Sequence, residues 1–294
     1  MSPRVAFLGL GTMGLPMARN LAHAELPLLV WNRSPSKLEA WSNGGVASTP
    51  AEAAAAADIV VTMLTGGDAL EAVLFGEAGA ATAPVRGKLF VDMSTTGPAA
   101  AHKVAARLAA LQAAFVDAPV SGSRAPAEKA ELVVLAGGQA EDIDRARSVF
   151  AAVARAVIVA GPVGAGQTLK VVLNGMGCQQ LLAFASMLRL GERAGLSRAV
   201  LLEAFSSGAF ATPAYAAKRS RVLQKRYGDP DFVLELVLRD AELCAELQRE
   251  LGVELPTHLA ARQEVARAVA QGFGSRDLFC VEELYSDFRT GEPK

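Results

Sequence analysis

Residues 5–14, with the sequence VAFLGLGTMG, decide the fold. Four strand-like apolar residues lead directly into Gly9-Leu10-Gly11-Thr12-Met13-Gly14, which matches the pattern G-x-G-x-x-G. In that pattern the first glycine permits a tight turn, the second lets backbone amides approach a pyrophosphate, and the third allows a helix to pack closely on the strand. A plain glycine-rich turn is the alternative. Because the motif opens an alternating α/β pattern, we predict a dinucleotide-binding loop.

The chain up to about residue 161 alternates short apolar runs with helical stretches, which predicts a parallel sheet covered by helices on both faces. Strands are expected at 5–8, 28–31, 59–63, 89–92, 132–136 and 157–159. Thr49-Pro50-Ala51-Glu52 predicts a helix start, with Thr49 as N-cap and Glu52 completing a capping box. The alanine run that follows is interpreted as helix because alanine is the best helix former.

After the Gly/Pro cluster at 161–166 the strand signals vanish and helical patterns continue to the C-terminus. We therefore predict a doubly wound α/β domain over residues 1–163 and an all-α domain over residues 164–294. A helix at about 167–194 is apolar nearly all round, as expected of a long helix that joins the two domains and is buried between them or between subunits. Breaks at 195–197, 208 and 227–230 separate the later helices.

Composition excludes several classes of function. The 294 residues carry a net charge of −1 with both signs dispersed, so neither nucleic acid nor an anionic membrane is expected as a partner. Cys178, Cys244 and Cys280 lack disulfide or metal spacing, and the three histidines are isolated, so no metal is expected. No apolar run reaches membrane-spanning length, so membrane insertion is not expected. A cytoplasmic protein is expected.

The end of the second predicted strand bears on the choice of cofactor. An acid at this point binds the ribose 2′-hydroxyl of NAD, whereas a 2′-phosphate requires basic residues. The sequence has Trp31-Asn32-Arg33-Ser34 with Lys37 nearby, and no acid before Glu39. Arg33 and Lys37 can pair with a phosphate, and Asn32 and Ser34 can donate hydrogen bonds to it. NADP(H) is favoured over NAD(H), with an exposed basic loop as the alternative.

Lys170 is the only charged residue between Arg155 and Arg189, in a stretch that is otherwise predicted to be buried. Burial disfavours the charged form of an amine, so a lysine in such a place points to chemistry. Asn174 follows four residues later, on the same face of a helix. The pair could hold and protonate a carbonyl oxygen. The alternative is a lysine that reaches solvent along its stem.

Four motifs together resemble the β-hydroxyacid dehydrogenase family: residues 9–14, Val91-Asp92-Met93-Ser94-Thr95-Thr96, Asp117-Ala118-Pro119-Val120-Ser121-Gly122-Ser123, and Lys170 with Asn174. Within the family, residues 32–34, 121–128 and 213–215 resemble the NADPH-dependent glyoxylate/succinic semialdehyde reductase branch. The resemblance implies a Rossmann domain, an all-helical C-terminal domain, an active site in the cleft between them, and a homodimer or homotetramer.

The resemblance also implies roles for individual residues. Lys170 would be the general acid/base and Asn174 its partner. Substrate would be held by Ser121, Gly122, Ser123, Thr96, Phe232 and Arg239. Cofactor would be held by Gly9, Leu10, Gly11, Thr12, Met13, Gly14, Asn32, Arg33, Ser34, Lys37, Met63, Leu64, Thr65, Thr95, Arg239 and Asp240.

Two positions depart from the family pattern. Arg239 stands where the family has lysine beside its aspartate, which changes the size and direction of the cation and so bears on substrate range. Ala130 stands where this branch commonly has glycine, and only a local backbone adjustment is expected there.

The expected activity is the reversible reduction of a small aldehyde or keto acid by NADPH, and glyoxylate, succinic semialdehyde and related semialdehydes all remain open. One alternative is an imine reductase on the same fold, against which Lys170 counts. The other is a non-catalytic dinucleotide-binding oligomer, against which Lys170, Asn174 and Ser121 count together.

Overall fold

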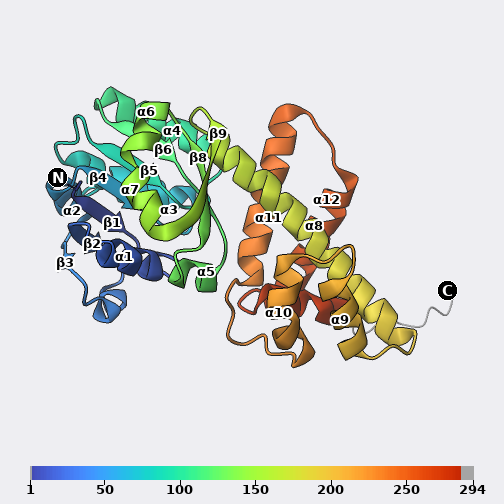
Figure 1. Cartoon of the computed structure of the whole chain (residues 1–294). Coiled ribbons are helices and arrows are strands. Elements are labelled where there is room, and N and C mark those ends of the chain that lie inside the picture. The colour runs from blue at the N-terminus through green and yellow to red at the C-terminus, as the bar shows by residue number, and fades with distance from the viewer. Residues whose placement is uncertain (1, 286–294) are drawn as a thin grey trace. The chain divides into compact units, whose positions relative to one another are not determined.

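The computed structural model describes residues 2–285 and divides into two compact units, Met1–Val171 and Val172–Lys294. The division falls within the helix α8 (Ala165–Arg193), so the first turns of this helix belong to the first unit. Every strand of the described residues lies in the first unit, as Figure 1 shows. Lys170 is in the first unit and Asn174 in the second, four residues apart on one continuous helix.

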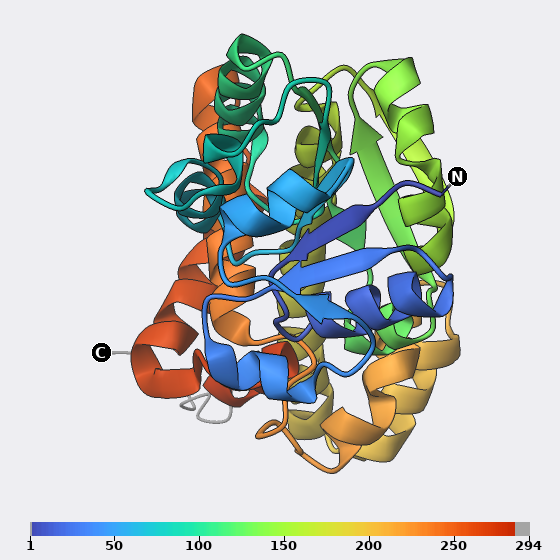
Figure 2. The same cartoon turned by 90° about the vertical axis from the view of Figure 1, so that its left-hand side faces the viewer.

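The first unit is built on one sheet of nine strands in the order β3-β2-β1-β4-β5-β6-β8-β7, with β9 paired to β8. Strands β1 to β6 pair in parallel, and β1 and β2 run side by side in the same direction in Figure 2. The strands are β1 Val5–Leu8, β2 Leu28–Trp31, β3 Gly45–Val46, β4 Ile59–Thr62, β5 Leu89–Asp92, β6 Ala114–Asp117, β7 Val120–Ser121, β8 Leu132–Gly137 and β9 Ala154–Gly161.

All six strands predicted from the sequence are present, whereas β3, β6 and β7 were not predicted. The strand order reverses at β1, which has β2 on one side and β4 on the other. In doubly wound sheets ligands bind in the crevice outside the carboxyl ends of the strands at such a switch point. The topology therefore directs attention to the loops that follow β1 and β4.

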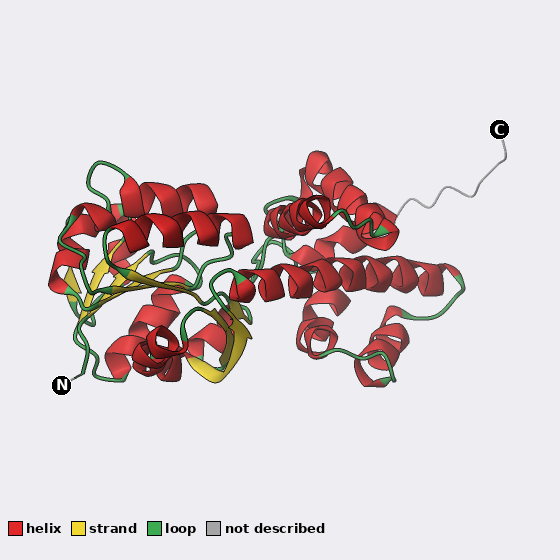
Figure 3. Cartoon of the chain, turned by 90° about the horizontal axis from the view of Figure 1, so that it is seen from above, coloured by secondary structure: helices red, strands yellow, loops and turns green. Residues whose placement is uncertain are grey.

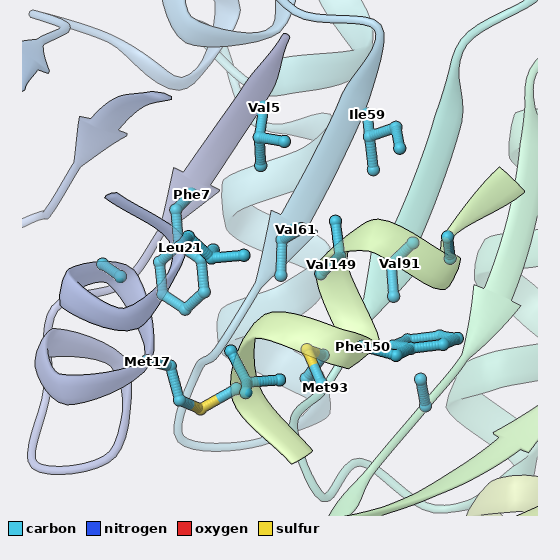
Figure 4. Close-up of a cluster of buried hydrophobic side chains, with 14 of the residues drawn as sticks. Val5, Phe7, Met17, Leu21, Ile59, Val61, Val91, Met93, Val149 and Phe150 are labelled. Atoms are coloured by element: carbon cyan, nitrogen blue, oxygen red, sulfur yellow. The ribbon is translucent and has the colours of Figure 1, made fainter. Parts of the chain in front are cut away.

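Helices cover both faces of the sheet (Figure 3). Because side chains alternate along a strand, Val5 and Phe7 of β1 pack on one face and Ala6 and Leu8 on the other. The first face is covered by α1 and α7, and Figure 4 shows their side chains against β1, β4 and β5. The second is covered by α2, α3 and α4. The helices are α1 Gly14–His23, α2 Pro50–Ala56, α3 Gly67–Phe75, α4 Pro98–Ala110, α5 Arg124–Glu128, α6 Ala140–Arg145 and α7 Arg147–Val153, with 3₁₀ turns at Pro35–Ala40 and Ala80–Thr82.

The predicted start of α2 is confirmed. The hydroxyl of Thr49 accepts a hydrogen bond from the Glu52 amide at 3.0 Å. The Glu52 carboxylate reaches back to the amide of Ser48 at 2.7 Å, one residue before the N-cap. At the other end, the Lys88 amine donates to the carbonyls of Ala54, Ala55 and Ala57, the last carbonyl groups of the helix.

The second unit is helical. After α8 come α9 Arg198–Ser207, α10 Pro213–Leu223, α11 Leu234–Leu251, α12 Pro256–Ala268, a π-helical turn at Val269–Phe273 and a 3₁₀ segment at Leu278–Tyr285. The Phe184 ring is central to its core, with centroids 5.5 Å from Phe205, 4.8 Å from Tyr215 and 5.1 Å from Phe279. The predicted helix breaks are confirmed, and a further break at 252–255 separates α11 from α12.

In the single chain, helix α8 is only partly covered, because Val172, Met176, Met187 and Leu190 are each about half exposed, between 50% and 56%. Its burial between domains or between subunits stays a prediction. Helix α8 is also long and apolar enough to cross a membrane, judged by length and composition alone. Its most apolar 18 residues have a mean hydropathy of 1.3, and 44% of them are buried. The expectation that no segment reaches that length was therefore wrong. The core helix of a soluble protein has the same length and composition, so these two properties are shared by core helices and membrane-spanning helices.

Candidate active site

A pocket of about 450 Å³ opens at the carboxyl ends of β1 and β4, where the topology places a ligand site. The lining includes nine of the residues predicted to hold the cofactor: Gly9, Gly11, Asn32, Arg33, Ser34, Lys37, Met63, Leu64 and Thr65. It also includes residues that sequence reasoning missed, namely Trp31, Pro50, three residues of α3 and the segment 76–79. No local motif marks segment 76–79, because only the tertiary fold brings it to the pocket.

The three motif glycines have the separate roles that the motif predicts. Gly9 has a φ of 110°, and a Cβ there would collide with the Met63 carbonyl. A Cβ on Gly14 would collide with the Gly9 carbonyl, so α1 packs directly on the loop. A Cβ on Gly11 meets nothing within 4 Å, although Gly11 lines the pocket. This space fits the pyrophosphate of a dinucleotide, beside a helix N-terminus that has no side-chain cap.

Asn32 organises the loop. Its Oδ1 accepts a hydrogen bond from the Leu10 amide at 2.8 Å, and its Nδ2 donates to the Ser34 carbonyl at 3.0 Å. Asn32 therefore ties the glycine loop to the end of β2, in addition to lining the pocket. Arg33, Ser34 and Lys37 lie beside it on the pocket wall, whereas Leu10, Thr12, Met13 and Gly14 are not part of the lining.

The loop after β5 is tied to the loop after β4. The Ser94 hydroxyl accepts a hydrogen bond from the Leu64 amide at 2.8 Å. Thr96 is buried, and its hydroxyl donates to Asp92 at 3.1 Å, so this hydroxyl is engaged inside the protein. Thr95 is the partly exposed member of the pair. Thr96 was predicted to contact substrate; its hydroxyl is bonded to Asp92, and a substrate contact by its other atoms stays a prediction.

Two buried carboxylates lie at the ends of neighbouring strands, since Asp92 and Asp117 are paired residues of β5 and β6. Burial raises the pKa of both, and that of Asp117 reaches about 6. Asp92 accepts from the hydroxyls of Thr62 and Thr96, and Asp117 accepts from the amides of Gly164 and Gln167 at 2.7 Å. Sequence reasoning assigned no role to Gln167, because its burial and its partners, 70 to 73 positions away, follow only from the tertiary structure.

The predicted carboxylate loop lies between β7 and α5. Ser121 pairs with Val133 in the sheet, and Ser121 and Ser123 are partly exposed. Gly122 has a φ of 133°, and a Cβ there would lie 2.7 Å from the Leu132 side chain. A side chain at Gly122 is therefore excluded both by backbone conformation and by space. Arg124, which follows Ser123, pairs with Glu128 at 2.8 Å.

In the second unit, Asn174 is held by an acid. Its Nδ2 donates to Asp240 Oδ2 at 2.6 Å, while Arg239 donates to Asp240 Oδ1 from Nε at 3.0 Å and from Nη2 at 2.6 Å. Because a carboxylate only accepts hydrogen bonds, the nitrogen end of the Asn174 amide must face Asp240. The amide oxygen is therefore turned away from the acid. Phe232, also predicted at the site, packs against the helical core.

Among the described residues, the cysteines and His258 are all buried. The three cysteines are buried and free, and burial raises the pKa of Cys178 and of Cys280 to about 12. His258 is buried, with Nδ1 2.8 Å from the Gln248 amide nitrogen. Within residues 2–285 no group of three or more His, Cys, Asp or Glu side chains is placed to bind a metal ion.

Comparison with known proteins gives a consistent family. Residues 4–161 match the NAD binding domain of 6-phosphogluconate dehydrogenase, and residues 164–284 match the NAD-binding domain of NADP-dependent 3-hydroxyisobutyrate dehydrogenase. Glyoxylate/succinic semialdehyde reductase 1 of Arabidopsis thaliana is 31% identical over 95% of this chain and 97% of its own. NAD-dependent L-serine dehydrogenase of Pseudomonas aeruginosa is 31% identical over 96% of this chain and 97% of its own.

Among solved structures, 3-hydroxyisobutyrate dehydrogenase from Salmonella typhimurium superposes with a TM-score of 0.87 at 27% identity. The match covers 96% of this chain and 99% of the other. These matches span both units and agree with the motifs, the sheet topology and the pocket. The chain belongs to the 3-hydroxyisobutyrate dehydrogenase-like family of β-hydroxyacid dehydrogenases, which are oxidoreductases with a nicotinamide dinucleotide cofactor.

Proposed function

We propose that this protein is an NADPH-dependent reductase of a small aldehyde or keto acid, such as glyoxylate, succinic semialdehyde or a related semialdehyde. The observation that carries the proposal is the pair of Lys170 and Asn174, one turn apart on α8, with the Asn174 amide fixed by Asp240. The similarity to a glyoxylate/succinic semialdehyde reductase supports the substrate class.

The bound cofactor would supply the hydride. The protein supplies the proton and the positions. Lys170 would donate a proton to the carbonyl oxygen of the substrate during reduction and would accept it during oxidation. The Asn174 oxygen, turned away from Asp240, would accept a hydrogen bond from the Lys170 ammonium or from the substrate hydroxyl. Ser121 and the amides of Gly122 and Ser123 would hold the substrate carboxylate.

The preference for NADPH is proposed from the pocket wall. Arg33, Ser34 and Lys37 line it next to the end of β2, where a family member that binds NAD through its ribose would place an acid. A guanidinium contributes charge-assisted hydrogen bonds to a 2′-phosphate. Arg33→Ala should therefore raise the KM for NADPH about 10- to 100-fold and leave the KM for NADH nearly unchanged. An equal effect on both cofactors would contradict this assignment.

The activity is tested by NADPH and NADH oxidation against a panel of short aldehyde acids, keto acids and cyclic imines. Lys170→Ala should lower kcat by about 10²- to 10⁴-fold while NADPH binding, measured by fluorescence titration, is retained. Lys103→Ala, an exposed lysine of α4 in the same unit, is the matched control and should leave kcat unchanged. Turnover of imines alone, or unchanged activity of Lys170→Ala, would reject the proposed reaction. NADPH binding without turnover would favour a non-catalytic role.

A homodimer or homotetramer is proposed as the assembly. The half-exposed apolar side chains of α8 support it, because such a stripe is stabilised when another surface covers it. Light scattering coupled to size-exclusion chromatography tests it, and a monomer at micromolar concentration would contradict it.

A further inference from the structure

A buried amide joins the loop after β5 to the first turn of α8. Gln167 has no exposed surface, and all of its side-chain polar atoms are hydrogen-bonded to main-chain groups of residues 94–97. Its Oε1 accepts from the amides of Thr96 at 3.0 Å and Gly97 at 3.1 Å, and its Nε2 donates to the Ser94 carbonyl at 2.8 Å. The side chain thus pairs with the loop in the way a neighbouring strand would.

The main chain at Gln167 is fixed from the opposite side. Its amide and that of Gly164 donate to the two oxygens of Asp117, each at 2.7 Å, at the N-terminus of α8. A carboxylate is favoured there by the helix dipole. Gly166 cannot carry a side chain, because a Cβ would lie 2.8 Å from the Asp117 carbonyl and closer still to that of Leu135. The first turn of α8 therefore has little room to rotate or slide.

The same loop is connected to the cofactor pocket. Ser94, whose carbonyl accepts from Gln167, also accepts through its hydroxyl from the amide of Leu64, a lining residue. A continuous set of hydrogen bonds thus runs from the pocket wall through the loop that carries Thr95 to Gln167. Lys170 lies three residues after Gln167, about one helical turn, so any displacement of Gln167 moves Lys170 with it.

A space-filling role does not account for these contacts. An apolar side chain of similar volume would fill the same position, but it would leave two buried amides and one buried carbonyl without partners. Gln167 satisfies all three at once. What the three bonds fix is the position of the Lys170 turn relative to the Thr95 loop, which is the geometry that a proton donor and a nicotinamide loop require.

We propose that Gln167 is a positioning residue of the reaction, which holds the Lys170 turn of α8 in register with the loop of residues 94–97. The inference rests on the proposed function. Reactions between positioned groups lose about 100-fold in rate for a misplacement of about 1 Å. Gln167→Met keeps the approximate volume and removes the three hydrogen bonds. It should lower kcat about 10- to 100-fold, leave the KM for NADPH within about twofold, and raise the primary isotope effect with deuterated NADPH.

Gln167→Glu provides a readout that loss of stability would not produce. The glutamate can still accept from the two amides, but when ionised it places an oxygen against the Ser94 carbonyl. When protonated it can donate there as the glutamine does. Its activity relative to wild type should therefore recover as the pH falls. The charged groups that face it are Asp92 and Asp117 on the neighbouring strands, with the His102 ring beside Gly164. Both carboxylates disfavour its ionised form.

Lys88→Met is the matched control, since it too removes three hydrogen bonds from a side chain to backbone groups of the first unit, here three carbonyls away from α8. It should lower thermal stability without lowering kcat. Equal losses of kcat in Lys88→Met and Gln167→Met, or a Gln167→Glu pH profile parallel to wild type, would overturn the proposal.

Hydrogen exchange separates this proposal from the proposed function. In Gln167→Met the amides of Thr96 and Gly97 should exchange faster, while those of β1 and β4 keep their wild-type rates. Unchanged exchange at the two amides would overturn the positioning role whatever the substrate. If wild type turned over none of the panel, the proposed function would fail, and the exchange rates alone would decide whether Gln167 fixes the loop.

Discussion

Ala130 is expected to be a strained position that glycine would relieve. Its φ is 57°, in the left-handed region, between the end of α5 and the start of β8. An L-residue there costs about 1–2 kcal/mol because its Cβ approaches the following carbonyl oxygen, and glycine has no Cβ. This is a region of backbone conformation that glycine adopts readily, and the expected local backbone adjustment stays a prediction.

The size of the effect follows from two opposing contributions. Ala130→Gly would relieve about 1–2 kcal/mol in the folded state. It would also give the unfolded chain more freedom, which costs about 0.4–1 kcal/mol. The net gain in the free energy of unfolding therefore lies between about 0 and 1.6 kcal/mol and is centred on about 0.8 kcal/mol. For a unit the size of Met1–Val171, a gain of 1 kcal/mol corresponds to a rise in Tm of about 2–4 °C.

Thermal and urea unfolding of Ala130→Gly, followed by circular dichroism, measure this gain. Ala106→Gly is the matched control, because Ala106 is an exposed residue in the interior of α4 with ordinary helical geometry. There the same chemical change should lower stability by about 1 kcal/mol. The two variants should thus shift Tm in opposite directions. If Ala130→Gly lowered Tm as Ala106→Gly does, the strain argument would be refuted.

Three further outcomes are expected. Gly11→Ala should weaken NADPH binding about tenfold in fluorescence titration with Tm nearly unchanged, because its Cβ meets no protein atom and projects at the pocket; a large fall in Tm would contradict this. The pKa of Asp117 is raised from 3.8 to about 6, so the native state binds this proton more tightly than the unfolded state. Its contribution to stability should be greatest below about pH 4 and should fall by roughly 3 kcal/mol as the pH rises through 6. Urea unfolding across pH 4–7 should show that the free energy of unfolding depends less steeply on pH in Asp117→Asn than in wild type. The same dependence in both proteins would contradict the raised pKa of Asp117. Glu282→Ala should destabilise the helical unit by about 3–5 kcal/mol, because Arg198, whose Nη1 lies 3.0 Å from Glu282 Oε1, would lose a buried partner. An unchanged unfolding temperature in calorimetry would contradict this.

Local sequence patterns predicted much of the first unit. The strand at residues 5–8 and the six residues after it form the predicted loop, and two of its glycines are required sterically, since a Cβ on Gly9 would collide with the Met63 carbonyl and one on Gly14 with the Gly9 carbonyl. The N-cap at Thr49 was equally readable, since its partner Glu52 is only three residues away. Strand β6 was missed because Ala114 follows an alanine-rich helix, and four residues give too short a period to distinguish.

The buried polar network of the candidate site was not readable in the same way. Asp92 and Asp117 were quoted only as parts of motifs, and nothing in their neighbours along the chain indicates that they share a register or that Asp117 bonds to the start of α8. Gln167 contacts residues about 70 positions away, and Asn174 contacts Asp240 at a separation of 66. Such contacts depend on which strands pair and which helices pack, so they carry no periodic signal.

The sequence by itself determined the dinucleotide loop, most strands, the change to helices after residue 166 and the isolated Lys170, because short-range sterics and apolar periodicity specify these features. Only the tertiary structure decided that Asp117 bonds to the start of α8, that Gln167 bonds to the loop of Thr95 and that Asp240 orients Asn174. The physical reason is that a buried polar group must find its partner wherever the fold places one, and that partner is set by packing and not by distance along the chain.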